Sequence, residues 1–86
     1  MYEILTHNKA IKYYESLNII IIKKMNEAID EIKINPFIGN NIKKLKGKLD
    51  GKYRYKLGDL RIVYRVNEGS KKVFIEAIGP RGDVYK

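Results

Sequence analysis

The sequence predicts an α+β fold: an N-terminal strand and an αα-hairpin packed on a mainly antiparallel sheet of four to five strands. Two features of the sequence predict it. Apolar residues recur at spacings of three and four across residues 8–34, as in helices, and at spacings of two across residues 43–78, as in strands. The chain has 86 residues, whereas a typical domain has roughly 100–150. We therefore expect a single domain over residues 1–86, with one modest core.

One short strand and one helix are expected at the start of the chain. Residues 2–6 alternate weakly between polar and apolar and predict the strand. Asn8 can cap a helix that runs to about Leu17, because its side-chain oxygen can accept an unpaired backbone N–H. The apolar stripe of this helix comprises Ala10, Ile11, Tyr14 and Leu17.

A second helix is expected from Ile19 to about Ile34, separated from the first by only one or two residues. Asn18 can cap its start. Asn35–Pro36 ends it, because the residue before a proline is pushed out of the α region. Its buried face is expected to consist of Ile21, Ile22, Met25, Ala28, Ile29 and Ile32.

The second half of the chain predicts four strands separated by turns that contain glycine. Gly58–Asp59 has the two-residue length of a tight hairpin turn. Gly79–Pro80 is expected to break the ladder after the last strand. The expected strands are Lys43–Lys48, Lys52–Leu57, Leu60–Val66 and Lys71–Ile78.

The expected hairpin turn decides which side chains face each other. A two-residue loop places Lys56 opposite Arg61 and Lys52 opposite Arg65. One face of the hairpin then carries Tyr53, Tyr55, Leu57, Leu60, Ile62, Tyr64 and Val66. The other face carries Lys52, Arg54, Lys56, Arg61, Val63 and Arg65. Opposed like charges cost about 0.2–1 kcal/mol per pair, so we expect a counter-charge from outside, with phosphate as the obvious candidate. The alternative is that the long side chains splay apart into water.

Most of the positive charge lies in one segment. The chain carries 18 Lys and Arg against 10 Asp and Glu, a formal net charge of +8. Residues 43–65 hold nine of the cations and only two of the acids, so this segment accounts for +7 of the net charge. Its cations alternate with Tyr, Ile and Val in strand-like order, so we expect them to share a face. This favours a polyanion surface over an ordinary solvated charge run.

The composition excludes several kinds of site. The chain has no cysteine, which rules out disulfides and thiolate metal sites and fits a reducing cytoplasm. The longest apolar run, Ile19–Ile22, is far shorter than the roughly 20 residues of a membrane-spanning helix, and the N-terminus lacks the basic region of a secretory signal. We expect a cytoplasmic protein with no cofactor, no metal and no membrane partner. The one histidine, His7, is expected to be a turn or cap residue rather than a catalyst.

Three blocks of the second half carry a recognisable pattern: Leu45–Gly47, Tyr53–Val66 and Gly79–Lys86. Together they resemble the RelE/ParE superfamily of toxin–antitoxin systems. The closing Pro-Arg-Gly-x-x-Tyr-Lys is most similar to archaeal RelE toxins. The resemblance covers the full length in the order of its elements, and it implies a compact microbial ribonuclease fold.

The resemblance also implies a reaction, the metal-free cleavage of mRNA in the ribosomal A site. In RelE-type enzymes the ribonucleotide 2′-OH attacks its own 3′ phosphate and the 5′-OH leaves. Arg61 matches the arginine that stabilises the phosphorane-like transition state, and Arg81 matches the one that contacts the phosphate and assists the leaving group. Tyr85 matches the tail tyrosine that orients or deprotonates the 2′-OH. Arg54 and Lys56 match two strand cations of the catalytic sheet; the first is commonly Lys, so Arg54 is less able to carry a proton.

Several points stay open in the sequence. The general base is either Tyr85 or a lysine. Six further cations are expected to bind RNA, namely Lys43, Lys44, Lys46, Lys48, Lys52 and Arg65. The expected partners are a cognate RelB-like antitoxin and the ribosome with its mRNA and rRNA. Two alternative functions remain: a ParE-like poison of DNA gyrase without nuclease activity, and a plain basic RNA-binding module. Arg61, Arg81 and Tyr85 together favour the RelE type, because ParE members typically lack the tail tyrosine and the full set of cations.

Overall fold

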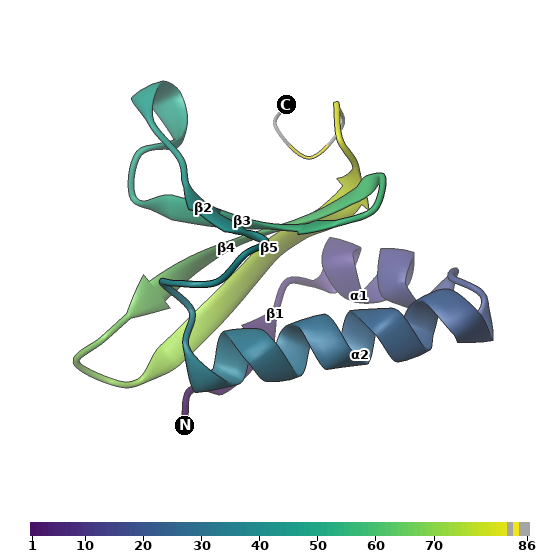
Figure 1. Cartoon of the computed structure of the whole chain (residues 1–86), viewed down its shortest axis with the longest axis horizontal. Coiled ribbons are helices and arrows are strands. Elements are labelled where there is room, and N and C mark those ends of the chain that lie inside the picture. Colours follow the sequence, from purple (N-terminus) through teal and green to yellow (C-terminus); the bar gives the residue numbers. More distant parts are fainter. Residues whose placement is uncertain (83, 85–86) are drawn as a thin grey trace.

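A five-stranded sheet carries both helices on one of its faces (Figure 1). The computed structural model describes residues 1–82 and 84. The elements are β1 (Glu3–Thr6), α1 (Asn8–Glu15), α2 (Ile19–Ile34), β2 (Ile42–Lys44), the 3₁₀ turn η1 (Gly47–Leu49), β3 (Lys52–Leu57), β4 (Leu60–Asn67) and β5 (Lys72–Pro80). The strand order is β1-β5-β4-β3-β2, with β1 parallel to β5 and the other neighbours antiparallel. The predicted fold class is confirmed.

α1 is capped by a different residue from the one predicted. The Nδ1 atom of His7 accepts the backbone N–H of Lys9 at 3.1 Å, and Asn8 is the first helical residue. The assignment of the cap to Asn8 was wrong by one position, because an imidazole nitrogen can accept the same bond as a side-chain oxygen. The expectation that His7 is a cap residue is confirmed. The helix ends at Glu15 rather than near Leu17, so the connection to α2 has three residues instead of one or two.

α2 spans the predicted residues. The Oδ1 atom of Asn18 accepts the backbone N–H of Ile21 at 3.0 Å and so caps the helix as expected. Half of the predicted face is fully buried, namely Met25, Ala28 and Ile32, and the other half is partly buried, namely Ile21, Ile22 and Ile29. The Tyr55 hydroxyl of β3 donates to the carboxylate of Glu31 on this helix. Burial and this hydrogen bond raise the pKa of Tyr55 to about 12.

The β3–β4 hairpin has the predicted register. Lys56 pairs with Arg61, and Lys52 pairs with Arg65. Gly58 takes the first turn position with a φ of 58°, in the left-handed region that glycine enters without strain. A glycine at this position suits the type II′ turn that two-residue hairpins favour.

The strand expected at Lys43–Lys48 does not form over that range. β2 covers only Ile42–Lys44, and the chain enters η1 at Gly47. Gly47 has a φ of 69°, and its carbonyl accepts the backbone N–H of Asp50 at 3.1 Å. The prediction was wrong because an alternation of lysine and apolar residues does not hold the chain extended where a glycine permits a tight turn.

The last strand is longer than predicted. Gly79 pairs with Arg61 and Pro80 pairs with Leu60, so Gly79–Pro80 extends the ladder and does not break it. β1 pairs with β5 only as far as Ile75. Beyond that residue β5 is an edge on one side, where a proline is tolerated.

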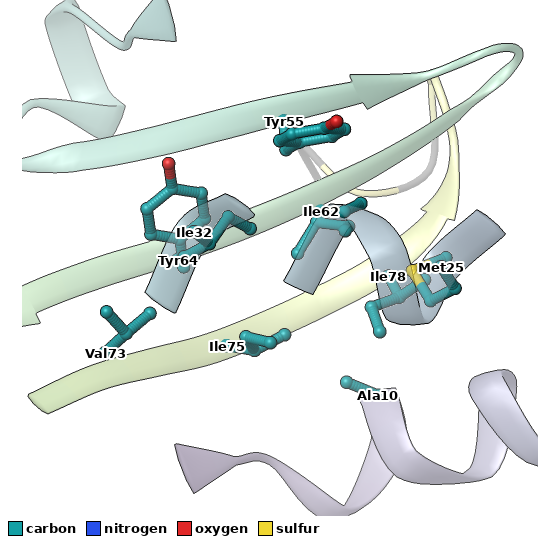
Figure 2. Close-up of a cluster of buried hydrophobic side chains, with 10 residues drawn as sticks. Ala10, Met25, Ile32, Tyr55, Ile62, Tyr64, Val73, Ile75 and Ile78 are labelled. Carbon is teal, nitrogen blue, oxygen red and sulfur yellow. The ribbon is translucent and has the colours of Figure 1, made fainter. Parts of the chain in front are cut away.

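The core lies between the helices and the face of the sheet that they cover, here called the inner face (Figure 2). Its buried residues are Ala10, Met25, Ala28, Ile32, Tyr55, Ile62, Tyr64, Val73, Ile75 and Ile78. Tyr64 is fully buried, and its hydroxyl donates to the carbonyl of Pro36 at 2.7 Å. This bond satisfies the one polar atom of the ring, and burial raises the pKa of Tyr64 above its ordinary value.

Truncation of Ile32 should show that the buried side of α2 contributes more to the free energy of unfolding than its exposed side does. Ile32 is fully buried, so Ile32→Ala should lower the free energy of unfolding by about 2–5 kcal/mol through a lost contact surface and a cavity. Ile34 is 71% exposed on the same helix, so Ile34→Ala should change it by less than about 0.5 kcal/mol. Urea unfolding followed by circular dichroism measures both values. Equal losses in the two variants would contradict the packing of α2.

Candidate functional site

The face of the sheet away from the helices, here called the outer face, carries most of the cations of the hairpin. Directly paired residues of neighbouring strands share a face. The pairs Lys52–Arg65, Arg54–Val63 and Lys56–Arg61 alternate with the pairs that contribute Tyr55, Ile62 and Tyr64 to the core. The predicted division of the hairpin into an apolar face and a basic face is therefore confirmed.

Arg61 is held at the turn of this hairpin. It is only 8% exposed, and its Nη1 atom donates to the carbonyls of Gly58 at 2.8 Å and Leu60 at 2.9 Å. Two carbonyl acceptors fix the plane of the guanidinium without neutralising its charge. Arg61 is therefore a preorganised cation, whereas its cross-strand neighbour Lys56 is exposed.

The end of β5 brings a second arginine to the same turn. The backbone N–H of Arg81 donates to the carbonyl of Asp59 at 3.2 Å, directly after the two last pairs of the β4–β5 ladder. A Cβ atom added to Gly79 would lie 3.4 Å from Cγ1 of Val84, so the chain folds back over β5 at this glycine. We call Lys56, Arg61 and Arg81 the turn-end cluster. Arg81 itself is exposed.

Arg54 leans toward the edge of the sheet. Its Nη1 atom donates to the carbonyl of Asn41 at 2.8 Å, just before β2. The same carbonyl accepts the backbone N–H of Lys56 at 2.8 Å. Arg54 is therefore partly buried and fixed beside β2, one position along the outer face from the turn-end cluster.

The other cation pair of the outer face has a counter-charge from within the molecule. Lys52 Nζ lies 2.8 Å from Oε1 of Glu76, and Arg65 Nε lies 2.8 Å from Oε2 of the same carboxylate. Burial by itself would raise the pKa of Glu76, but Lys52 and Arg65 outweigh it, and the net pKa is lowered from its usual value of 4.5. The expectation that both cation pairs need an outside anion is wrong for this pair.

A β-bulge puts Glu76 in this position. Val63 pairs with Ala77, but the next residue, Tyr64, pairs with Ile75, so Glu76 is the extra residue of β5. A bulge of this kind re-aims a side chain relative to a regular ladder. Glu76 was missed because only the hairpin register was worked out from the sequence. The available signal was that Glu76 is the one acid within the expected strand Lys71–Ile78.

The four lysines expected to bind RNA near β2 do not share one face. Lys43 pairs with Arg54 and belongs to the outer face. Lys44 pairs with Tyr53 and therefore belongs to the helix side. Lys46 immediately precedes η1, and Lys48 lies within it. Both lysines are outside any strand and exposed. The assumption that these cations share a face was wrong, because β2 ends at Lys44.

Tyr85, the tyrosine proposed as base or orienting group, lies outside the described residues. Within residues 1–82 and 84, no group of three or more His, Cys, Asp or Glu side chains is arranged to hold a metal ion. Neither α1 nor α2 is long and apolar enough to cross a membrane, and these are the α-helices in the part of the chain that the structure describes.

Comparison with known proteins identifies the family. The model of the family described as "ParE toxin of type II toxin-antitoxin system, parDE" matches residues 5–85. A curated protein from Methanocaldococcus jannaschii, named "Putative toxin RelE1", is 33% identical over 82 residues, which cover 93% of this chain and 90% of that protein. The chain belongs to the RelE/ParE family of type II toxin–antitoxin toxins.

Solved structures of RelE toxins share the fold. The archaeal RelE–RelB complex from Pyrococcus horikoshii OT3 contains a chain that matches with a TM-score of 0.81 and 30% identity, over 95% of this toxin and 97% of that chain. The intact RelBE complex of E. coli contains a chain that matches with a TM-score of 0.80 and 25% identity, over 94% and 98%. The resemblance to archaeal RelE toxins is therefore confirmed.

Protonation of Glu76 should remove the stability that its ion pairs supply. Because the folded-state pKa lies below the usual 4.5, this contribution is complete above about pH 4.5 and is lost as the pH falls through the lower folded value. The melting temperature of Glu76→Gln should therefore lie below that of the wild type at about pH 7, and the two should converge at about pH 2. Thermal unfolding followed by circular dichroism measures the difference. Glu68→Gln, in the exposed β4–β5 turn, is the control and should follow the wild type; a Glu76→Gln difference that does not depend on pH would contradict the assignment.

Proposed function

We propose that this toxin is a ribosome-dependent endoribonuclease that cleaves mRNA in the A site without a metal. The observation that carries the proposal is Arg61, a buried guanidinium oriented by two carbonyls beside the exposed Lys56. Cations fixed before the reaction are the best stabilisers of charge that develops on a phosphate. The similarity to RelE toxins supports the same chemistry.

In the proposed reaction the 2′-OH of one nucleotide attacks the phosphate on its own 3′ side. The bond from the 2′ oxygen to phosphorus forms, the bond from phosphorus to the 5′ oxygen breaks, and a 2′,3′-cyclic phosphate remains. Arg61 stabilises the pentacoordinate phosphate. A guanidinium has five N–H donors, and the two carbonyls engage those of Nη1. The donors on Nε and Nη2 are the ones that we propose bind the phosphate oxygens.

The proton of the 2′-OH goes to a base, and the departing 5′ oxygen takes a proton from water. We propose Tyr85 or Lys56 as the base, and Arg81 as the group that binds the phosphate on the leaving side. Arg54, fixed to the carbonyl of Asn41, contributes positive charge and no proton transfer. The toxin supplies few acid–base groups, so we infer that the ribosome supplies much of the rate by positioning the mRNA.

We infer two kinds of partner. The similar chains from Pyrococcus horikoshii and E. coli were solved in complex with RelB, and we propose that a cognate RelB-like antitoxin binds this toxin. The net charge of +8 suits an acidic partner and also the anionic surface of the ribosome. A toxin that acts on translating ribosomes works in the cytoplasm.

One observation favours a second candidate. The matching family model is described as a ParE toxin of the parDE system, and a ParE-like toxin would bind DNA gyrase without any nuclease activity. The two functions differ in what the turn-end cluster does. A gyrase poison needs no arginine oriented for a phosphate, whereas the nuclease depends on it.

Charge removal at the turn-end cluster should abolish cleavage. The experiment adds the purified toxin to translating ribosomes and maps mRNA ends by primer extension. Wild-type toxin should cut in the A site, and Arg61→Ala or Arg81→Ala should each slow cleavage by about 10²–10³-fold, the loss seen when one charge-stabilising donor is removed. Tyr85→Phe should also reduce cleavage sharply. Lys24→Ala, an exposed lysine of α2, is the matched control and should cleave at the wild-type rate.

The other outcomes of this experiment decide between the alternatives. Uncut mRNA with the wild-type toxin, together with an arrest of supercoiling by gyrase, would replace the nuclease by the ParE-like function. Binding to an unrelated duplex that weakens steeply with salt, without cleavage, would support the plain RNA-binding module.

A further inference from the structure

The cations at the two ends of the outer face have different hydrogen-bond and ion-pair partners. At the turn end, Arg61 is bound to neutral carbonyls, and Lys56 is exposed. At the other end, both oxygens of the Glu76 carboxylate are engaged, one by Lys52 and one by Arg65, each at 2.8 Å. We call Lys52, Arg65 and Glu76 the Glu76 triad.

The triad lies apart from the proposed reaction site. Lys52 and Lys56 are four residues apart on β3, which corresponds to about 13 Å along the strand. A single-stranded RNA that crosses the face from one end to the other would therefore pass both groups of cations within two or three nucleotides. Whether this RNA binds both groups of cations depends on whether Lys52 and Arg65 are free to contact phosphate.

The surface beside the triad is apolar. A depression of about 380 Å³ lies next to Arg65 and Glu76, and its other lining residues are Leu5, Thr6, His7, Phe74 and Ile75. Leu5 is 37% exposed and Phe74 is 39% exposed. A phosphate placed here would lie against the hydrocarbon of Leu5 and Phe74 and beside the Glu76 carboxylate, which is unfavourable for an anion.

We propose that Glu76 is a built-in counter-ion that withdraws Lys52 and Arg65 from RNA binding and confines the phosphate-binding surface to the turn end and the β2 edge. The inference rests on the proposed function in one respect, that the ligand is RNA. The carboxylate is placed by the β-bulge of β5, so its position beside both cations is set by the sheet itself. The lowered pKa of Glu76 keeps it ionised at neutral pH.

A neutralised cation leaves a signature in the salt dependence of binding. Each phosphate that a protein neutralises on a single strand adds about −0.7 to the slope of log K against log salt. Lys52 and Arg65 should contribute less to this slope in the wild type than two free cations would, because the Glu76 carboxylate binds both and cancels one of their two charges. Removal of the carboxylate should make them available, and the slope should become steeper.

The experiment measures binding of a fluorescent 2′-O-methyl RNA oligonucleotide, which cannot be cleaved, by fluorescence anisotropy from about 50 to about 200 mM salt. Glu76→Gln should bind more tightly than the wild type, with a slope steeper by about 0.7–1.4 for one or two added phosphates. Glu68→Gln makes the same change of net charge in an exposed turn and is the matched control; its slope should equal that of the wild type.

Truncation of the two cations tests the inference independently and does not depend on whether Glu76→Gln folds. In the wild-type sequence, Lys56→Ala should make the slope shallower by about 0.7, and Lys52→Ala and Arg65→Ala should each make it shallower by less than that. In the Glu76→Gln background the same two truncations should remove the gain. Circular dichroism verifies that each variant is folded.

Two results would overturn the inference. One is a Glu76→Gln slope no steeper than that of Glu68→Gln, whether or not the wild type binds the probe. The other is a loss of slope in wild-type Lys52→Ala or Arg65→Ala as large as that in Lys56→Ala. Failure of the proposed function looks different: mRNA on ribosomes stays uncut although the salt slopes follow the expected pattern.

Discussion

The two-residue turn at Gly58–Asp59 is the constraint on which the rest of the structure depends. It sets the register of the central hairpin, and because side chains alternate between faces, it also decides which residues enter the core and which stay outside. One shift in register would send Tyr64 outward and Arg61 inward. The turn also supplies acceptors for the site that it creates, since the carbonyl of Gly58 binds Arg61 and that of Asp59 binds the backbone of Arg81.

The inner face gives this hairpin a rigid support. The two tyrosines that β3 and β4 bury each reach a partner beyond the sheet: Tyr55 donates to Glu31 of α2, and Tyr64 donates to the carbonyl of Pro36 just after α2. These hydrogen bonds connect the hairpin to α2 and to the residue just after it, in addition to the packing of their side chains. Contacts of the inner face therefore fix the positions of the strands that carry the outer-face side chains, as a preorganised site requires.

The arginines of the outer face differ in whether their acceptor is a neutral carbonyl or a carboxylate. Arg61 and Arg54 are bound to neutral carbonyls and keep their charge for a ligand, whereas Arg65 is bound to the carboxylate of Glu76. The sheet thus contains cations that neutral carbonyls orient and cations that share one carboxylate. A count of basic residues along β3 and β4 cannot distinguish the two groups, because the distinction depends on acceptors from other segments.

The sequence by itself determined the change from helical to strand periodicity, the cap at Asn18 and the register of the β3–β4 hairpin, because each depends on residues close together in the chain. It also indicated the toxin family through motifs of the second half. Only the tertiary structure decided that Glu76 faces Lys52 and Arg65. The physical reason is that alternation along a strand assumes a regular ladder, and one extra residue in β5 shifts a carboxylate onto another strand's cations.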